Sequence, residues 1–416
     1  MGDMIRIRGG RPLSGDVNIS SSKNAIVAIL PAVVMASEIV RLYDVPNIRD
    51  VKMLVSLLES LNIHIAVDGS TLTIDPTEIV NNPLVSQSVN KLRASYYFMG
   101  ALLGRFKHVK MLYPGGCNLG PRPIDLHLKG FEALGAKVET YDEIIEISAE
   151  ELIGNEIYLD IASVGATINI MLAAVFAKGR TVINNAAKEP EIIDLSSMLN
   201  KMGAQIRGAG TSEITIDGIS RLKGCIHEVI PDRIEAGTYV ILSVATGGNI
   251  VVHNVIPQHI ESLLLKLEEM GVKMEIGMDY VKILEVGPLE AVDVKTLTFP
   301  GFATDLQQPL TTLMTQARGV SMVEETIYRE RFKHCEQLNK MGANIRVEEG
   351  KSFTRGVTPL KGAAIEATDL RCGAALVIAG LIAEGVTEIS NAYHIYRGYD
   401  SIIEKLRALG AEIEEA

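Results

Sequence analysis

The chain has 416 residues and a formal net charge of −11 at pH 7, with 47% hydrophobic residues, 5% aromatic residues and no tryptophan. This length suits about two or three domains with aliphatic cores, and the acidic balance argues against a nucleic-acid partner, which requires a basic face. The longest apolar run, residues 25–36, contains Pro31 and is shorter than the roughly 18–20 residues of a membrane span.

The N-terminal residues lack the apolar stretch of a secretory signal. The four cysteines are far apart and form no CxxC pair; they are Cys117, Cys225, Cys335 and Cys372. Isolated cysteines are typical of proteins in a reducing compartment, so the sequence indicates a cytoplasmic protein.

One phrase, in which a helix ends and a strand begins, recurs six times along the chain. Five copies carry glycine in the same column and the first carries asparagine; the residues are Asn62, Gly135, Gly203, Gly271, Gly342 and Gly410. Glycine and asparagine tolerate the left-handed conformation that ends many helices. The copies are 68 to 73 residues apart, which exceeds the roughly 20–50 residues of a solenoid repeat. We therefore expect one supersecondary unit copied six times.

The residues between two phrases predict the same elements in every copy. Each phrase leads into a hairpin, as in residues 204–218 and 272–287, where apolar residues alternate around a turn. A strand, a helix, a second strand and an amphipathic helix follow. The first helix is apolar nearly all round, which predicts burial on every side; these helices span residues 25–36, 95–104, 167–177, 238–247, 309–319 and 374–385.

The sixth copy stops before its second hairpin strand, and the start of the chain supplies a candidate replacement. Residues 5–24 align without a gap onto residues 214–233, so we expect the N-terminal strand to complete the last unit. Three units per domain then predict one domain of residues 22–231 and another of residues 1–21 plus 232–416. The predicted fold class is α/β, with each domain built from three βαβαββ units.

Charged residues recur where strands lead into helices. The equivalent positions hold Lys23, Arg93, Ser163, Asp232, Arg233, Asp305, Asp369 and Arg371 at the first such junctions, and Cys117, Arg122, Glu189, Arg331 and Arg397 at the second. Helix N-termini repel arginine but attract anions, and arginine binds carboxylate or phosphate with two hydrogen bonds. The pattern therefore favours a site for an anionic ligand, although Asp232 and Asp369 are equally well explained as helix caps.

One junction, residues 114–123, has extra glycines and prolines, which predict an exposed loop. Cys117 lies in this loop near arginines, where a thiolate forms readily. We expect the other three cysteines, at positions 225, 335 and 372, to be buried as small hydrophobic residues.

Several motifs together resemble the UDP-N-acetylglucosamine 1-carboxyvinyltransferases, a family of enolpyruvyl transferases. They are SKNA (22–25), LRAS (92–95), PGGCNLGPRPIDLH (114–127), SVGAT (163–167), PDRIEAGT (231–238), TDLQ (304–307), DLR (369–371) and RGY (397–399). The resemblance spans the whole chain. It implies two inside-out α/β barrel domains with the active site in the cleft between them, no cofactor and no metal.

The resemblance also implies the reaction and its residues. The enolpyruvyl group of phosphoenolpyruvate moves to the 3-hydroxyl of UDP-N-acetylglucosamine by addition and elimination, and phosphate is released. By the resemblance, this reaction begins peptidoglycan precursor synthesis. Cys117 matches the proton donor that fosfomycin alkylates, and Asp305 matches the base. Phosphoenolpyruvate is expected to contact Lys23, Asn24, Arg122, Arg371 and Arg397. The UDP-sugar is expected to contact Arg93, Arg122, Pro123, Ile124, Asp125, Leu126, Ser163, Val164, Gly165, Asp305 and Ile327. Arg331 and Asp369 are expected to support the residues that contact the substrates.

Three alternatives differ in function. The sister enolpyruvyl transferase that acts on shikimate 3-phosphate has the same fold, but Asn24 after Lys23 and the Cys117 loop favour the UDP-sugar. A DNA sliding clamp also has six related units, but it needs basic helices around a central hole. In this chain the first helix of each unit is apolar and the net charge is negative, which argues against a clamp. A paralogue that binds UDP-sugar without catalysis conflicts with the presence of Cys117, Asp305 and Lys23.

Overall fold

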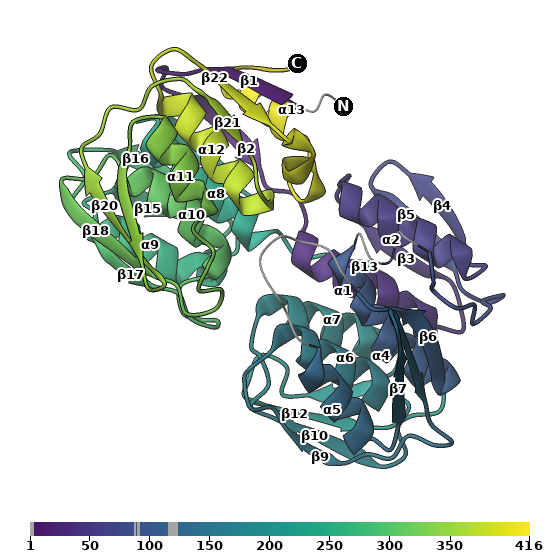
Figure 1. Cartoon of the computed structure of the whole chain (residues 1–416). Helices are drawn as coiled ribbons and strands as arrows, with labels where there is room; N and C mark the ends of the chain where they lie inside the picture. Colours follow the sequence, from purple (N-terminus) through teal and green to yellow (C-terminus); the bar gives the residue numbers. More distant parts are fainter. Residues whose placement is uncertain (1–3, 87–88, 90–91, 115–123) are drawn as a thin grey trace. The chain divides into compact units, whose positions relative to one another are not determined.

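The computed structural model describes residues 4–86, 89, 92–114 and 124–416 (Figure 1). Cys117, Arg122 and Pro123 lie outside the described residues. The chain divides into two compact units, which exchange at Ser20–Ser21 and again at Ile230–Pro231. Each crossover falls one residue before the position expected from the repeat. None of the described helices is long and apolar enough to cross a membrane.

The unit between Ser21 and Ile230 contains three copies of the repeat. The first copy comprises α1 (Lys23–Ala32), β3 (Val40–Tyr43), α2 (Arg49–Ser60), β4 (His64–Asp68) and β5 (Thr71–Asp75). The second comprises η2 (Arg93–Tyr96), α4 (Tyr97–Phe106), β6 (His108–Leu112), α5 (Asp125–Ala133), β7 (Lys137–Tyr141) and β8 (Ile144–Ser148). The third comprises β9 (Glu156–Tyr158), α6 (Val164–Ala174), β10 (Arg180–Asn184), α7 (Pro190–Lys201), β11 (Gln205–Arg207) and β12 (Glu213–Asp217), and β13 (Ile226–Glu228) follows.

Apolar helices form the interior of this unit and sheets form its exterior. The described strands make sheets in the orders β13-β3-β5-β4, β6-β8-β7 and β11-β12-β10-β9. The apolar helices α1, α4 and α6 are buried almost throughout, and α4 packs against both of the others. The arrangement confirms the predicted inside-out α/β architecture (Figure 1).

The other unit repeats this design with both ends of the chain. Its elements begin with β1 (Met4–Arg8), β2 (Ser14–Asn18), α8 (Arg233–Ala245), β14 (Asn249–His253), η3 (Pro257–Ile260), α9 (Glu261–Glu269), β15 (Lys273–Ile276) and β16 (Tyr280–Glu285). They continue with β17 (Asp293–Lys295), α10 (Thr304–Met314), β18 (Gly319–Glu324), α11 (Lys333–Lys340), β19 (Asn344–Glu348) and β20 (Lys351–Gly356). The last are β21 (Ala364–Glu366), α12 (Leu370–Ile382), β22 (Val386–Ser390), η4 (Ala392–Arg397), α13 (Ile402–Ala408) and β23 (Glu412–Glu415). The apolar helices α8, α10 and α12 pack against one another.

The N-terminal strands complete two sheets of this unit. β1 lies between β22 and β23 and is antiparallel to both, with Ile5 opposite Ile389 and Ile7 opposite Ile413. β2 runs parallel to β14, as β13 runs parallel to β3 in the other unit. The prediction that the start of the chain completes the last repeat is therefore confirmed.

The recurring phrase ends helices as predicted. Asn62 has a φ of 63° and the glycine at position 203 has a φ of 110°, and the other four glycines of the column are also left-handed. A β-branched residue there would be strained by its own backbone. The column therefore stops each amphipathic helix and directs the chain into the hairpin.

Ile7→Ala tests whether β1 belongs to the core. Ile7 has no exposed surface, so its truncation should lower the free energy of unfolding by about 2–5 kcal/mol. Ile276→Ala is the control, because Ile276 is 51% exposed and its loss should change stability by only about 0.5 kcal/mol. Urea unfolding of both variants measures the difference, and equal stabilities would contradict the placement of β1.

Candidate active site

The predicted site residues that the structure describes form two sets, one in each unit. The unit that contains α1 and α6 holds one set, near the starts of helices: Lys23, Asn24, Arg93, Ile124, Asp125, Leu126, Ser163, Val164 and Gly165. The other unit holds Asp305 on α10, Ile327 after β18, Arg331, Asp369, Arg371 on α12 and Arg397 at the end of η4. Lys23, Arg93 and Arg371 lie in the first turns of α1, η2 and α12, whereas Arg331 precedes α11 and Arg397 ends η4.

Asp305 is held between two buried arginines. Its Oδ1 accepts a hydrogen bond from Arg331 Nη1 at 2.7 Å, and its Oδ2 accepts from Arg371 Nη2 at 3.0 Å and Nε at 3.2 Å. The arginine side chains are 4% and 3% exposed, whereas that of Asp305 is 23% exposed. Among these three groups, the carboxylate is the one most accessible to solvent.

These arginines decide the protonation state of Asp305. Burial by itself would raise the pKa of Asp305, but the charges of Arg371, Arg331 and Arg233 outweigh it and hold the pKa well below its usual value. The carboxylate is therefore ionised at neutral pH. It can accept a proton, and it accepts one more readily once an arginine is drawn away, because each ion pair stabilises the charged form.

Arg371 is fixed by a chain of hydroxyl groups. Its Nη1 donates to the Tyr399 hydroxyl at 3.3 Å, which lies 2.9 Å from Thr238 Oγ1. The Thr238 hydroxyl donates to the Ile234 carbonyl at 2.7 Å, so Tyr399 is the donor to Thr238. These bonds connect α12 to α8 and set the plane of the guanidinium group.

Asp232 and Asp369 are helix caps. Asp232 Oδ1 accepts from the N–H groups of residues 234 and 235 at 2.8 and 3.0 Å. Asp369 Oδ1 accepts from the N–H groups of Arg371 and Cys372 at 2.9 and 3.1 Å. The capping alternative is therefore confirmed for both, and for Asp369 it also fixes the backbone from which Arg371 extends.

Lys23 begins α1 in the other unit. Ser22 caps this helix through a 3.2 Å bond from the Ala25 N–H, and Lys23 Nζ lies 3.3 Å from Asp50 Oδ2. Asp50 is buried in the first turn of α2. Asp50 was not among the predicted site residues, although it lies where a strand leads into a helix. An acidic residue opposite Lys23 could have been sought there, because a cation held near a helix start needs a counter-charge.

Two polar rings lie against the start of α6 at Gly165. Ser163 caps the helix by accepting from the Ala166 N–H at 3.3 Å. A Cβ atom at Gly165 would lie 2.9 Å from His127 Cε1 and 3.1 Å from the Tyr96 hydroxyl. Glycine thus allows these polar rings to reach the helix start. Arg93 lies over the Tyr96 ring at 5.6 Å, which places another predicted residue nearby.

His127 is a fixed, neutral donor at this helix start. Asn169 Oδ1 accepts from the N–H of residue 100 at 2.9 Å, so its Nδ2 donates to His127 Nδ1 at 2.8 Å. The ring proton therefore resides on Nε2. Burial, with a smaller contribution from Arg93, lowers the pKa of His127 to about 3. His127 is the last residue of the motif at 114–127, but no role was predicted for it.

The remaining predicted residues lie at loop and helix ends. Ile124 is buried before α5, Asp125 is exposed in its first turn and Leu126 is half-buried. Ile327 is 37% exposed, and Arg397 is half-buried. In the described ranges, no group of three or more His, Cys, Asp or Glu side chains is arranged to hold a metal ion.

The described cysteines are free thiols. Cys335 and Cys372 are buried as predicted, and burial raises the pKa of both. The prediction was wrong for Cys225, which is only half-buried because it precedes the short outer strand β13. Partial burial still raises the pKa of Cys225 to about 11.

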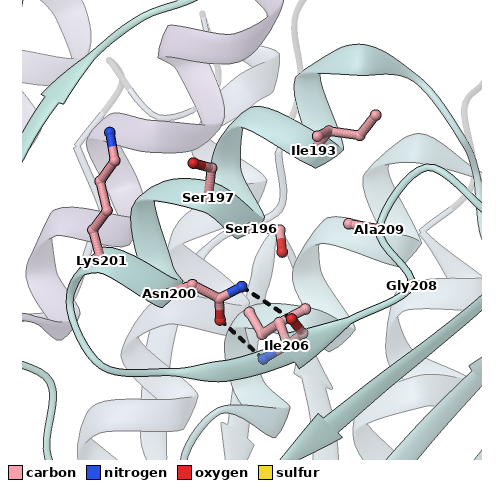
Figure 2. A pocket seen from close by; sticks show the side chains of 8 residues that line it. All are labelled: Ile193, Ser196, Ser197, Asn200, Lys201, Ile206, Gly208 and Ala209. Atoms are coloured by element: carbon pink, nitrogen blue, oxygen red, sulfur yellow. Dashed lines mark hydrogen bonds between the residues drawn. The ribbon is translucent and has the colours of Figure 1, made fainter.

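An open hollow of about 580 Å³ lies between α7 and the β11–β12 turn, away from the predicted residues. Figure 2 shows Asn200 bonded to both backbone groups of Ile206, each at 2.9 Å. Asn339 bonds Ile345 in the same way in the fifth repeat. A second hollow, of about 650 Å³, lies between α9 and β15 at the equivalent place of the fourth repeat. Both hollows are therefore features of the repeat.

Comparison with known proteins defines the class. The sequence pattern of the EPSP synthase family (3-phosphoshikimate 1-carboxyvinyltransferase) matches residues 7–406. The solved enolpyruvyl transferase NikO from Streptomyces tendae aligns with a TM-score of 0.90 at 26% identity, covering 99% of this chain and 98% of that chain. EPSP synthase from Acinetobacter baumannii shares the fold at 18% identity, with a TM-score of 0.76 and 99% of both chains covered. The fold is that of an enolpyruvyl transferase.

Closer relatives narrow the assignment. UDP-N-acetylglucosamine 1-carboxyvinyltransferase 2 of Geobacillus kaustophilus is 56% identical over 411 residues, which cover 99% of this chain and 96% of that protein. The protein of the same name from Staphylococcus aureus is 56% identical over 412 residues, covering 99% and 98%. The chain belongs to the family of UDP-N-acetylglucosamine 1-carboxyvinyltransferases.

The two most strongly shifted histidines give a pH prediction. His127 and His334 have pKa values lowered to about 3 by burial, so their rings should remain neutral in NMR spectra between pH 8 and pH 5. In urea the same rings should titrate near about 6.5. Their contribution to stability is therefore complete above pH 6.5 and is lost as the pH falls toward 3. Titration of either ring near 6.5 in the folded protein would contradict this environment.

Proposed function

We propose that this chain transfers the enolpyruvyl group of phosphoenolpyruvate to the 3-hydroxyl of UDP-N-acetylglucosamine and releases phosphate. The observation that carries the proposal is the Asp305 carboxylate between Arg331 and Arg371, in a chain that is 56% identical to enzymes of this name. The product would serve peptidoglycan precursor synthesis.

The cations account for the binding of phosphoenolpyruvate. We propose that Lys23, Arg122 and Arg397 hold its phosphate, that Asn24 contacts it, and that Arg371 takes its carboxylate. Lys23 and Arg371 each have a carboxylate partner in the protein, Asp50 and Asp305. An anionic substrate would replace part of each carboxylate's pairing with its cation. The two cations would then neutralise the substrate's charge, and neither cation would be buried without a partner.

The UDP-sugar is assigned to helix starts in the unit that contains α1 and α6. We propose that Arg93, the loop from Arg122 through Leu126 (with Pro123, Ile124 and Asp125), and Ser163, Val164 and Gly165 bind the nucleotide part. The N–H groups at the start of α6 suit its phosphates, because helix N-termini attract anions. Asp305 and Ile327 are assigned to the sugar.

The addition step requires one base and one acid. As the 3-hydroxyl oxygen bonds to C2 of phosphoenolpyruvate, its proton passes to Asp305 and the methylene carbon C3 takes a proton from Cys117. In the elimination step, C3 returns a proton to the Cys117 thiolate, the C2–O bond to phosphate breaks and the enol ether forms, and the departing phosphate takes the proton from Asp305. Transfer of Arg371 from Asp305 to the substrate carboxylate would increase the basicity of Asp305 when it is needed.

A cytoplasmic location is part of the proposal. The free thiols of Cys225, Cys335 and Cys372 support it, since unpaired cysteines persist in a reducing compartment. Its partners would then be the two small-molecule substrates alone.

Phosphate release tests the reaction. The purified protein should release phosphate from phosphoenolpyruvate when UDP-N-acetylglucosamine is present and should release none with either substrate alone. Shikimate 3-phosphate is the matched alternative acceptor, because the sister enzymes share the fold. Release with shikimate 3-phosphate in place of the UDP-sugar would reverse the assignment.

Fosfomycin labelling tests the acid. Mass spectrometry should find one covalent adduct, located on Cys117, and none in Cys117→Asp. The buried thiols provide an internal control: the pKa of Cys372 is raised to about 12, so little of its reactive thiolate is present at neutral pH. An adduct on Cys372 in the native protein would rule out Cys117 as the reactive group.

A further inference from the structure

Glu325 is a buried carboxylate with no role in the chemistry described above. It follows β18 directly and is 2% exposed. Its backbone N–H donates to the carbonyl of residue 350 at 2.9 Å, which extends the antiparallel pairing of β18 with β20. A carboxylate is costly to bury unless its oxygens are hydrogen-bonded, so the contacts of Glu325 indicate what it holds in place.

One oxygen of Glu325 organises the loop that follows the strand. Oε1 accepts from the N–H groups of Ile327 and Tyr328 at 2.8 and 3.0 Å, and from Thr296 Oγ1 at 2.8 Å. Ile327 is the residue of this loop that is assigned to the sugar. Glu325 therefore fixes the loop conformation in which Ile327 is presented.

The other oxygen leads to Asp305. Glu325 Oε2 accepts from Thr304 Oγ1 at 2.8 Å, and Thr304 Oγ1 accepts in turn from Arg331 Nη1 at 3.0 Å. The same Arg331 nitrogen donates to Asp305 Oδ1 at 2.7 Å. Because the Thr304 hydroxyl proton points to Glu325, the lone pairs of the Thr304 oxygen can accept the hydrogen bond from Arg331.

The geometry points to Glu325 as a positioning residue, which sets the Asp305 carboxylate and Ile327 relative to each other so that both meet one sugar. This inference rests on the proposed function. It joins two contacts that lie on different elements, α10 and the loop after β18, through one side chain. A small misplacement of a reacting group can cost about 10²-fold in rate, so such a link affects catalysis without touching substrate.

Two substitutions break the link at different points. Glu325→Gln keeps the oxygen that holds the loop but places an NH₂ group against Thr304, which reverses that hydrogen bond and leaves the Thr304 proton without Glu325 as acceptor. Thr304→Ala removes the hydroxyl while leaving Glu325 and its loop contacts in place. Thr304→Ser retains the hydroxyl and is the rescue variant.

Steady-state kinetics, calorimetric binding of UDP-N-acetylglucosamine and thermal unfolding of the full chain test the inference. We expect Glu325→Gln and Thr304→Ala each to lower kcat/KM for UDP-N-acetylglucosamine by about 10- to 100-fold, with KM for phosphoenolpyruvate unchanged. The double variant should be no worse than the more impaired single variant, because both changes break one link. Thr304→Ser should restore most of the activity.

Glu324→Gln is the matched control. Glu324 is the neighbouring residue, and its partly exposed side chain pairs with Lys295 at 3.4 Å and Lys351 at 4.0 Å. It should leave turnover unchanged. Unchanged turnover in Thr304→Ala, or additive losses in the double variant, would overturn the positioning role. A wild-type chain that neither turns over nor binds UDP-N-acetylglucosamine would instead overturn the proposed function, and this inference with it.

Discussion

A helix that is apolar on every side has to be enclosed, and this constraint sets the architecture of both units. Water must be excluded from α8, α10 and α12 all round, so they pack on one another and sheets cover their outer faces. Each apolar helix then starts where an outer strand ends. Burial of the helices thereby brings several helix N-termini into each unit, and every one offers N–H groups that are not bonded within its helix.

The same constraint explains why charge can be concentrated so heavily around Asp305. Two arginines close to a helix start are repelled by the positive end of the helix dipole and by each other. One carboxylate between them attracts both and offsets one of the two charges, while Tyr399 accepts from Arg371 Nη1 and Asp369 accepts from the backbone N–H of Arg371. The result is a set of cations that is fixed in position before any anion arrives, which lowers the reorganisation needed at the moment of reaction.

The sequence was most informative where physics allows few alternatives. The column from Asn62 to Gly410 predicted helix ends because few residues adopt a positive φ, and full apolarity predicted the buried helices. The pairing of β1 followed from an incomplete repeat. For the site, the recurrence of cations at the junctions predicted anion binding, and the family resemblance supplied the roles that stay predictions.

Partners supplied by distant segments could not be predicted. Asn169, for example, fixes His127 across 42 positions of sequence. Glu325 resembles any glutamate near the end of a strand until the fold brings Thr304 to it. A side chain's exposure also depends on its place in the sheet, and for that reason Cys225 was misjudged beside an outer strand.

The exchange of strands at the N-terminus has a consequence for synthesis on the ribosome. Every described strand of the unit between Ser21 and Ile230 has its partners once residue 230 has emerged. In contrast, β2 can pair only after β14 has been made, and β1 can pair only after β22 and β23, near the end of the chain, have been made. The first strands made are thus among the last to be paired. Because an unpaired strand is a template for wrong association, the short, charged β1, with Arg6 and Arg8 on its outer face, is well suited to that delay.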